Sequence, residues 1–296
     1  MAATIGSVLG DIEAFLYSLG HFRDRVATLT APVGESGTSL TVDDGTQVSK
    51  GLVEIDDELI YVQVADSTGT AVIPPWGRAQ VGTTAGSHAT GSRVRIHPAF
   101  PRSVIKRELQ TAISQLYPDL WSNVVDTTSI LTTLGDYTYT LPAAVESIVH
   151  LDVQPASTNY PWVPITRYRF DPDASTADFP SGKSLSFFQY LQADQVLKVT
   201  YRAKFTPFTS ESDTLASLGM SDRWVDILRD TVGARLILSL EAAKLAQAGT
   251  ATTRGDVTPF HAVNLSKHLT GLVTARTNEE RRKLLNDYQA RVVRHY

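Results

Sequence analysis

The residues that could carry chemistry are seven histidines and a run of acidic side chains. The histidines are scattered, without the spacing of metal ligands; they are His21, His88, His97, His150, His261, His268 and His295. The acidic run comprises Asp43, Asp44, Glu54, Asp56, Asp57 and Glu58. It could suggest calcium, but the ligand spacing of an EF-hand is absent and acidic turns are usually solvated. We therefore predict no metal site.

Catalytic and cofactor motifs are also missing from the sequence. It contains no Walker A motif, no Gly-x-Gly-x-x-Gly after a strand, no His-Glu-x-x-His and no Gly-x-Ser-x-Gly. His88 lies in a glycine-rich loop, but no partner acid or nucleophile can be assigned to it from the sequence. We expect a protein that is not an enzyme and has no cofactor. A glycan-cleaving enzyme is the remaining option, and it would need two carboxylates that face each other across a cleft.

The composition is that of an ordinary soluble globular protein. The chain has 296 residues, of which 20% are charged and 42% hydrophobic, and this is enough for two or three small domains. The net charge of −4 gives no argument for a nucleic-acid-binding protein. The absence of cysteine excludes a disulfide framework and fits assembly in a reducing cytoplasm. We expect neither a transmembrane helix nor a signal peptide.

The stretch from Gly51 to His97 has the alternating pattern of half-buried strands. It predicts strands at Leu52–Ile55, Glu58–Ala65, Thr70–Ile73 and Arg93–His97, after an opening strand near Ser39–Val42. The strands at Thr70–Ile73 and Arg93–His97 are separated by a long loop, Trp76–Gly91, which is rich in Gly, Thr and Ala. Loops of this length are usually functional or mobile.

Elsewhere helical and strand periodicities alternate along the chain. Helices are predicted at Ile5–Ala27, from Pro101 to Tyr117, and at Asp222–Ala248, Leu265–Val273 and Asn278–Tyr296, with a mobile loop at Ala246–Pro259. Strands are predicted at Thr128–Thr132, Tyr137–Leu141, Val145–Val153, Val163–Phe170, Ser184–Tyr190 and Val196–Ala203. Aromatic residues are dense among these strands. They could form a sugar-binding platform, but such clusters are more often core and cross-strand pairs.

The pattern predicts an α+β fold, a helical bundle that carries two antiparallel β modules and a C-terminal helical arm. One module is small and barrel-like, and the other is a β-sandwich. The predicted boundaries are an N-terminal helix at 1–28, the small β module at 29–98, a bundle helix at 99–124, the β-sandwich at 125–210, bundle helices at 211–275 and the arm at 276–296.

The predicted arm is basic on an otherwise acidic protein. Its narrow apolar stripe comprises Leu285, Tyr288, Val292 and Tyr296, and its basic side chains include Arg281, Arg282, Arg291 and Arg294. Such a stripe suits a groove on a partner. The alternative is a solvated terminal helix that packs on its own domain.

One set of residues carries a specific resemblance. It comprises Gly51, Ile55, Asp57, Glu58, Leu59 and Val62, then Gly77, Arg78, Gln80, Gly82, Thr83, Thr84, Ala85, His88, Gly91 and Val94. This order is similar to a β module common in neck and tail proteins of tailed bacteriophages. The order of helices and β modules resembles the head-to-tail adaptor family, whose ring docks directly beneath the portal.

The resemblance implies a structural virion protein of the phage neck, assembled in the host bacterial cytoplasm as a homododecamer. Its implied partners are the portal protein, the next neck or tail ring (stopper or tail terminator) and double-stranded DNA passing non-specifically, with no membrane. The implied portal-binding residues are Arg281, Arg282, Leu285, Tyr288, Arg291, Val292, Arg294 and Tyr296. We also expect an inter-subunit loop that orders on assembly and contains Arg78, Gln80, Gly82, Thr83, Thr84, His88 and Gly91.

Two other functions stay open at this point. The protein could be a stopper or tail-completion ring further down the neck. It could instead be a tail or baseplate protein that binds cell-surface glycan through the aromatic β-sandwich.

Overall fold

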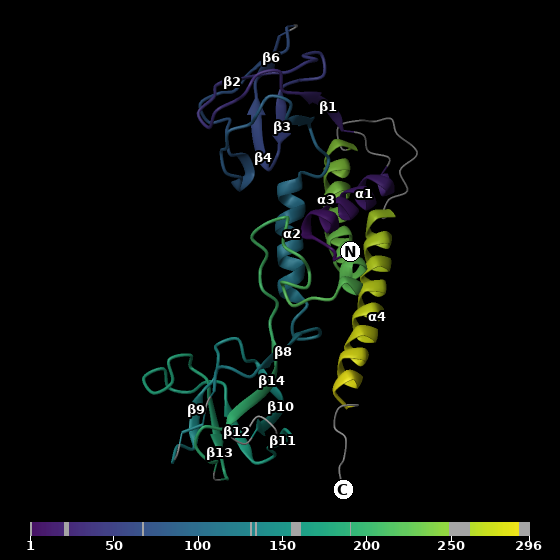
Figure 1. Cartoon of the computed structure of the whole chain (residues 1–296). Helices are drawn as coiled ribbons and strands as arrows, with labels where there is room; N and C mark the ends of the chain where they lie inside the picture. Colours follow the sequence, from purple (N-terminus) through teal and green to yellow (C-terminus); the bar gives the residue numbers. More distant parts are fainter. Residues whose placement is uncertain are drawn as a thin grey trace. The chain divides into compact units, whose positions relative to one another are not determined.

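The computed structural model describes residues 2–20, 24–66, 68–130, 132–133, 135–154, 161–189, 191–248 and 261–289. Within these residues the fold is α+β, with four α-helices and antiparallel sheets of three or four strands (Figure 1). None of the described sheets closes into a barrel, so the barrel-like form expected for the first β module is not found.

The chain divides into two compact units, which we describe separately. The first unit comprises Ala3–Ala112 and Val225–Thr274. The second comprises Met1–Ala2, Ile113–Trp224 and Ala275–Tyr296. The division falls within helices α2 (Arg102–Gln115) and α4 (His261–Gln289).

The first unit contains two sheets built from the predicted alternating strands. Their strands are β1 (Arg25–Thr28), β2 (Ser39–Thr41), β3 (Gly51–Ile55), β4 (Glu58–Val62), β5 (Val64–Ala65), β6 (Thr70–Val72) and β7 (Arg93–Ile96). The orders are β1-β7-β3-β4 and β2-β6-β5. One apolar cluster that includes Val53, Ile60 and Val94 forms their common core. The strands predicted at Leu52–Ile55, Thr70–Ile73 and Arg93–His97 are found as β3, β6 and β7, but the strand predicted at Glu58–Ala65 divides into β4 and β5, which belong to different sheets.

The N-terminal helix is shorter than expected. Helix α1 spans Ile5–Gly20, and residues 25–28, which we predicted to be helical, form strand β1. This strand pairs with β7 in register from Arg25 opposite Ile96 to Thr28 opposite Arg93. Four residues are too few to show a periodicity of their own, and pairing with a strand distant in sequence decides their conformation.

Helix α1 packs against α3 (Val225–Ala248), the long helix predicted from the sequence (Figure 1). The helices meet closely because Gly233 has no side chain: a Cβ at this position would lie 2.6 Å from the ring of Phe15. The guanidinium of Arg229, one turn earlier on α3, lies over the same ring at 5.2 Å from its centre. A short 3₁₀ turn, Asp222–Trp224, precedes α3.

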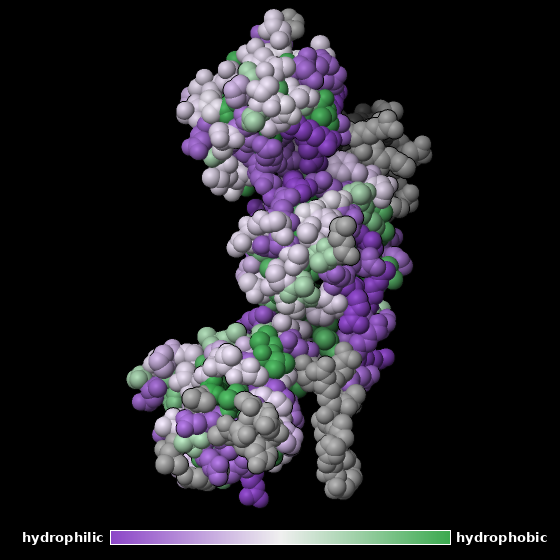
Figure 2. All heavy atoms as spheres, in the orientation of Figure 1, coloured by the Kyte–Doolittle hydropathy of each residue, from purple (hydrophilic) through white to green (hydrophobic). Residues whose placement is uncertain are grey.

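The second unit also has two sheets. Its strands are β8 (Ser122–Asp126), β9 (Thr138–Thr140), β10 (Ser147–Gln154), β11 (Val163–Pro164), β12 (Tyr168–Asp171), β13 (Ser184–Phe187) and β14 (Val196–Ala203), in the orders β11-β10-β14-β8 and β12-β13-β9. The aromatic residues lie mainly in or against the core, as Phe187, Tyr201 and Tyr139 show. Figure 2 shows only small groups of hydrophobic residues on the visible face.

Two strand predictions in this unit were wrong. The strand expected at Thr128–Thr132 lies earlier, at β8, because the carboxylate of Asp126 accepts hydrogen bonds from the N–H groups of Thr128 and Ser129 and turns the chain. The strand expected at Val163–Phe170 divides into β11 and β12, which belong to different sheets.

The C-terminal helices predicted at Leu265–Val273 and Asn278–Tyr296 are one continuous helix, α4, as far as Gln289. Asn278, where the second helix was predicted to begin, lies inside it, since neither glycine nor proline interrupts residues 272–289. Buried positions recur along it at Ser266, Leu269, Glu280 and Leu284. Residues 276–289 are therefore the end of a long helix and do not begin a separate arm.

Candidate functional site

The residues of the predicted loop are held by one buried carboxylate, that of Glu58. Its side chain is 2% exposed, and both of its oxygens accept hydrogen bonds from the Arg78 guanidinium at 2.7 Å. The main-chain N–H groups of Ala79 and Gly86 each donate to it at 3.0 Å. The His88 ring nitrogen Nε2 lies 2.9 Å from it. We call this set the Glu58 cluster.

The hydrogen bonds of the Glu58 cluster lower the pKa of Glu58 and hold the loop in place. Burial alone would raise the pKa of Glu58, but the hydrogen bonds from Arg78, Gly86, His88 and Ala79 outweigh it and lower the pKa to about 2. Arg78 also donates to the carbonyl oxygens of Gly34 and Gly86 at 2.6 Å. The cluster therefore joins strand β4 to both ends of the loop and to a second loop at Gly34.

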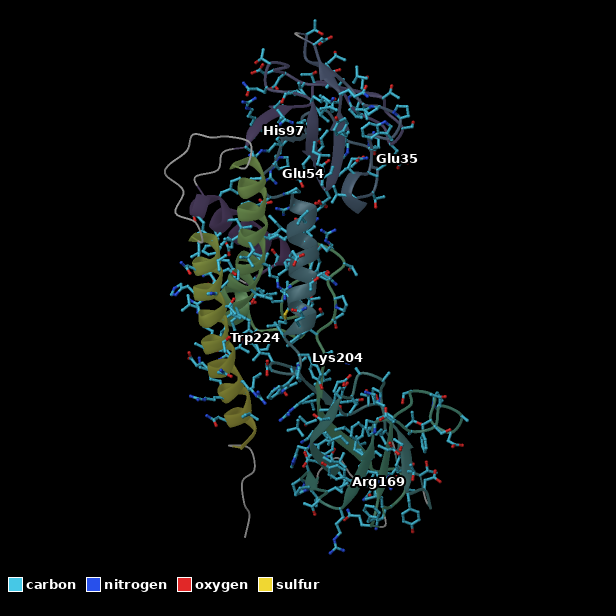
Figure 3. All side chains as sticks on the ribbon, turned by 180° about the vertical axis from the view of Figure 1, so that it is seen from behind. Glu35, Glu54, His97, Arg169, Lys204 and Trp224 are labelled. Atoms are coloured by element: carbon cyan, nitrogen blue, oxygen red, sulfur yellow. The ribbon has the colours of Figure 1, made fainter. Side chains whose placement is uncertain are left out.

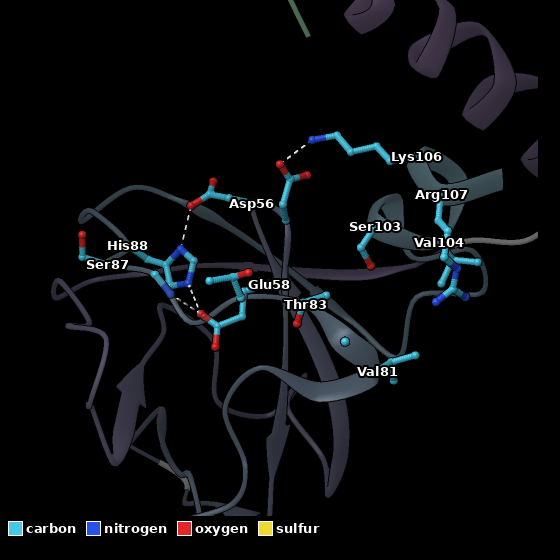
Figure 4. Close-up of a pocket in the computed structure, with 14 residues that line it drawn as sticks. Asp56, Glu58, Val81, Thr83, Ser87, His88, Ser103, Val104, Lys106 and Arg107 are labelled. Carbon is cyan, nitrogen blue, oxygen red and sulfur yellow. Dashed lines mark hydrogen bonds and ion pairs between the residues drawn. The ribbon is translucent and has the colours of Figure 1, made fainter. Parts of the chain in front are cut away.

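The sequence assigned no partner acid to His88, and the structure gives it two. Its Nδ1 lies 2.7 Å from the Asp56 carboxylate, while Nε2 faces Glu58 (Figure 4). Its main chain exchanges hydrogen bonds with Val33. The spacing Asp-x-Glu in a β-turn, followed by Arg and His, was the available signal, but pairing across 30 residues is not readable from one sequence.

Gln80, Thr83 and Gly91 of the predicted loop also bond inside the unit, whereas Thr84 is exposed and makes no hydrogen bond within the described residues. Gln80 donates to the carbonyl oxygens of Trp76 and Arg78, and the Thr83 hydroxyl accepts the N–H of Leu59 on β4. Gly82 and Gly91 have positive φ values of 78° and 90°, which glycine adopts without strain. These contacts hold the loop within the first unit. Its contact with another subunit stays a prediction.

A second ionic cluster, which the sequence analysis missed, surrounds Arg95 on β7. Its guanidinium lies 2.8 Å from carboxylate oxygens of both Asp24 and Glu54 and donates to the Tyr17 hydroxyl. Glu13 on α1 lies 3.5 Å from it and 3.1 Å from Arg102 on α2. This Arg95 cluster joins α1, the first sheet and α2.

Glu54 in this cluster caps helix α2. Its side chain is 1% exposed and accepts the main-chain N–H of Arg102 at 2.5 Å, where the sheet meets the first turn of α2 (Figure 3). Burial raises the pKa of Glu54 to about 7, against the lowering by Arg95 and by the α2 N–H groups.

A groove lies between the loop and the first turns of α2 (Figure 4). Its volume is about 490 Å³, and its walls include Asp56, Thr83, His88, Ser103 and Arg107. Most of its charges are paired: Asp56 with His88, Glu58 with Arg78 and Asp57 with Lys106.

The predicted portal-binding residues are only partly within the described residues. Arg281 pairs with Asp119 at 3.2 Å, Arg282 is exposed and Leu285 is 38% exposed. The same stretch also packs on its own unit: Leu284 is buried, and Glu280 accepts the indole N–H of Trp224 at 3.1 Å. The side chain of Tyr288 and all of Arg291, Val292, Arg294 and Tyr296 lie outside what the structure describes.

Within the described ranges, no group of three or more His, Asp or Glu side chains is placed to hold a metal ion. No helix in the described part of the chain is both long and apolar enough to cross a membrane. Comparison with family models, with curated proteins and with solved structures finds no match for this chain. The function is therefore inferred from the residues and their geometry.

Proposed function

We propose that this chain is a structural protein of the tailed-phage neck, a head-to-tail adaptor that forms a ring beneath the portal. The observation that carries the proposal is the Glu58 cluster. Glu58, Arg78, Gly86 and His88 lie in the stretch that resembles the phage β module, and they meet around one carboxylate. The motif thus has a coherent physical role, which is to build the module.

The order of elements supports the same proposal. Along the sequence, the strands of the first unit come between α1 and α2, and those of the second unit come between α2 and α3. In the proposed adaptor, the helices form the bundle that makes the ring, and the β modules are attached to it. Each contact between subunits is then heterologous, and a ring closes when the rotation returns on itself.

In this proposal the C-terminal end of α4 and the residues after it dock on the portal. Leu285 supplies an exposed apolar position beside the exposed Arg282. Apolar anchors would provide most of the affinity, while charges at the rim would set the association rate and the salt dependence. Double-stranded DNA would pass through the ring without specific recognition, in keeping with the net charge of −4.

The proposal is tested by assembly with the cognate portal. The protein is mixed with purified portal, and the complex is examined by negative-stain electron microscopy. An adaptor gives a second ring seated directly on the portal. A stopper or tail-completion protein would bind only after another neck protein has been added.

A tail or baseplate protein that binds glycan is the second candidate. The observation that favours it is the exposure of two aromatic side chains of the second unit, Tyr137 at 51% and Phe188 at 68%. Glycan-array binding that is lost in Tyr137→Ala and Phe188→Ala, together with no binding to portal, would favour this candidate over the adaptor.

A further inference from the structure

We propose that the groove beside α2 binds the free carboxylate of an extended peptide, the C-terminal residue of a protein partner. The inference concerns a ligand of the first unit and does not depend on ring formation. It rests on residues that line the groove and have hydrogen-bond donors without a partner in the described residues, and on the apolar wall beside them.

The first unpaired donor is Arg107. Its side chain is exposed and lines the groove, and no hydrogen bond or ion pair engages its guanidinium within the described residues. Its neighbour Lys106 is already paired with Asp57. Arg107 is therefore the cation of this groove that is available to a ligand, and a guanidinium binds a carboxylate through two parallel hydrogen bonds.

The second unpaired group is Ser103, one turn before Arg107 on α2. Its hydroxyl oxygen is shielded from solvent, lines the groove and makes no hydrogen bond in the described structure. A buried hydroxyl without a partner costs about 1–3 kcal/mol, so a ligand atom that pairs with it gains affinity. In Figure 4 the side chains of Ser103, Thr83 and Val81 border the same space.

The loop opposite α2 offers main-chain donors. Thr83 has extended φ and ψ angles of −77° and 170°. Thr84 and Ser87 line the groove, and their N–H groups make no hydrogen bond within the described residues. Unpaired N–H groups along an extended segment can pair with a peptide backbone, as in strand addition.

The end of the groove near Arg107 is apolar. Val81 and Val104 line it, and Val81 is 55% exposed. Val81 also has a φ of 56°, a left-handed conformation that is costly for a β-branched residue. Backbone strain of this kind is concentrated at ligand-binding sites. A terminal apolar side chain of the peptide would cover the exposed side chain of Val81.

The charges favour a single carboxylate over a nucleic acid. The rim carries the carboxylates of Asp56 and Asp57, which are 60% and 55% exposed. These would repel the repeated phosphates of DNA or RNA, whereas an otherwise neutral peptide backbone can pass them. A peptide that ends at Arg107 therefore fits the arrangement best.

The test uses the full-length protein and labelled five-residue peptides, Gly-Ser-Gly-Ala-X with X as Val, Leu or Phe. Each peptide is prepared as the free acid and as the C-terminal amide, and binding is measured by fluorescence anisotropy. We expect at least one acid to bind about ten-fold more tightly than its amide. Arg107→Ala should abolish this preference, Arg107→Lys should keep part of it, and Ser103→Ala should reduce it.

The control is Arg93→Ala, which removes an exposed arginine on β7 outside the groove and should leave binding unchanged. Circular dichroism checks that each variant is folded. The proposal is overturned if folded wild-type protein binds no acid peptide below about 1 mM, or binds acids and amides equally. It is also overturned if Arg107→Ala abolishes binding of a duplex oligonucleotide that binds more tightly than every peptide, which would identify a phosphate site.

Discussion

Arg78 donates two hydrogen bonds, each 2.7 Å long, to the opposite oxygens of the Glu58 carboxylate. The two side chains are 10% and 2% exposed, so removing one leaves the other charged and buried. We expect Arg78→Ala to lower the free energy of unfolding by about 3–5 kcal/mol. Urea denaturation measures this, with exposed Arg93→Ala as the control, expected within about 0.5 kcal/mol of the wild type. Equal effects would show that the Glu58 cluster does not hold the module.

Glu54 gives stability an unusual pH dependence. Because its pKa is raised to about 7, the folded state keeps a proton that the unfolded state releases near pH 4.5. The contribution of Glu54 therefore falls as pH rises from about 4.5 to 7, by on the order of 1–3 kcal/mol. The unfolding free energy of wild type minus that of Glu54→Gln should therefore decrease as pH rises over this range.

Glu58 provides the matched comparison for this pH dependence. Its pKa is lowered to about 2, so its contribution is present above pH 4.5 and is lost as pH falls towards 2. The difference between wild type and Glu58→Gln should shrink as pH falls below about 4.5. Parallel profiles for the two variants would refute the assignment of opposite shifts.

The contact of α1 with α3 requires a glycine. In Gly233→Ala the new methyl group would lie 2.6 Å from the Phe15 ring, and we expect a loss of about 1–3 kcal/mol despite the better helix propensity of alanine. Gly271 in α4 is the control, since a Cβ at this position would have no described atom within 4 Å beyond its own helix turn. Gly271→Ala should raise the thermal midpoint, and Gly233→Ala should lower it; a rise in both would mean that the helices do not meet at Phe15.

Substitutions of two neighbouring leucines on α4 distinguish a residue that contacts the portal from a residue that stabilises the fold. Leu285 is 38% exposed, so Leu285→Asp should leave the protein folded and weaken portal binding about ten-fold or more. Leu284 is 8% exposed, and Leu284→Ala should cost about 2–4 kcal/mol of stability. Surface plasmon resonance on immobilised portal and thermal denaturation measure the two effects. Unchanged portal affinity in Leu285→Asp would remove α4 from the proposed interface.

Truncation after Ala275 is a poor test of the same point. The sequence pattern predicted a separate arm at residues 276–296. The structure shows that such a cut would divide α4 and remove Glu280, the partner of the buried Trp224 indole. Loss of stability is the expected result, so substitutions on the exposed face are the better test.

The polar and apolar alternation in the first β module predicted where β3 and β7 lie, although β3 is buried on both faces over its last three residues. The pattern at Leu52–Ile55 and Arg93–His97 matches β3 and β7 within one residue. It failed for β1 and β8, whose conformation depends on strands far away in the sequence. Local periodicity does not contain that information.

The site was predictable only as a set of residues. The glycine-rich loop, Arg78 and His88 were singled out from the sequence, but not their meeting at Glu58. Neither the Arg95 cluster nor the groove was foreseen, because both combine residues from separate elements. Arg107 and Ser103 stand in an ordinary amphipathic helix, and only the position of α2 beside the loop makes them notable.

The proposed function depends most directly on whether the chain forms an adaptor ring on the portal. The measurement that decides this is cryo-electron microscopy of the protein mixed with its cognate portal, with mass photometry of the same sample. We predict a closed ring of copies of this chain on one face of the portal, around a channel wide enough for double-stranded DNA. A protein that stays monomeric and leaves the portal bare would contradict the proposal.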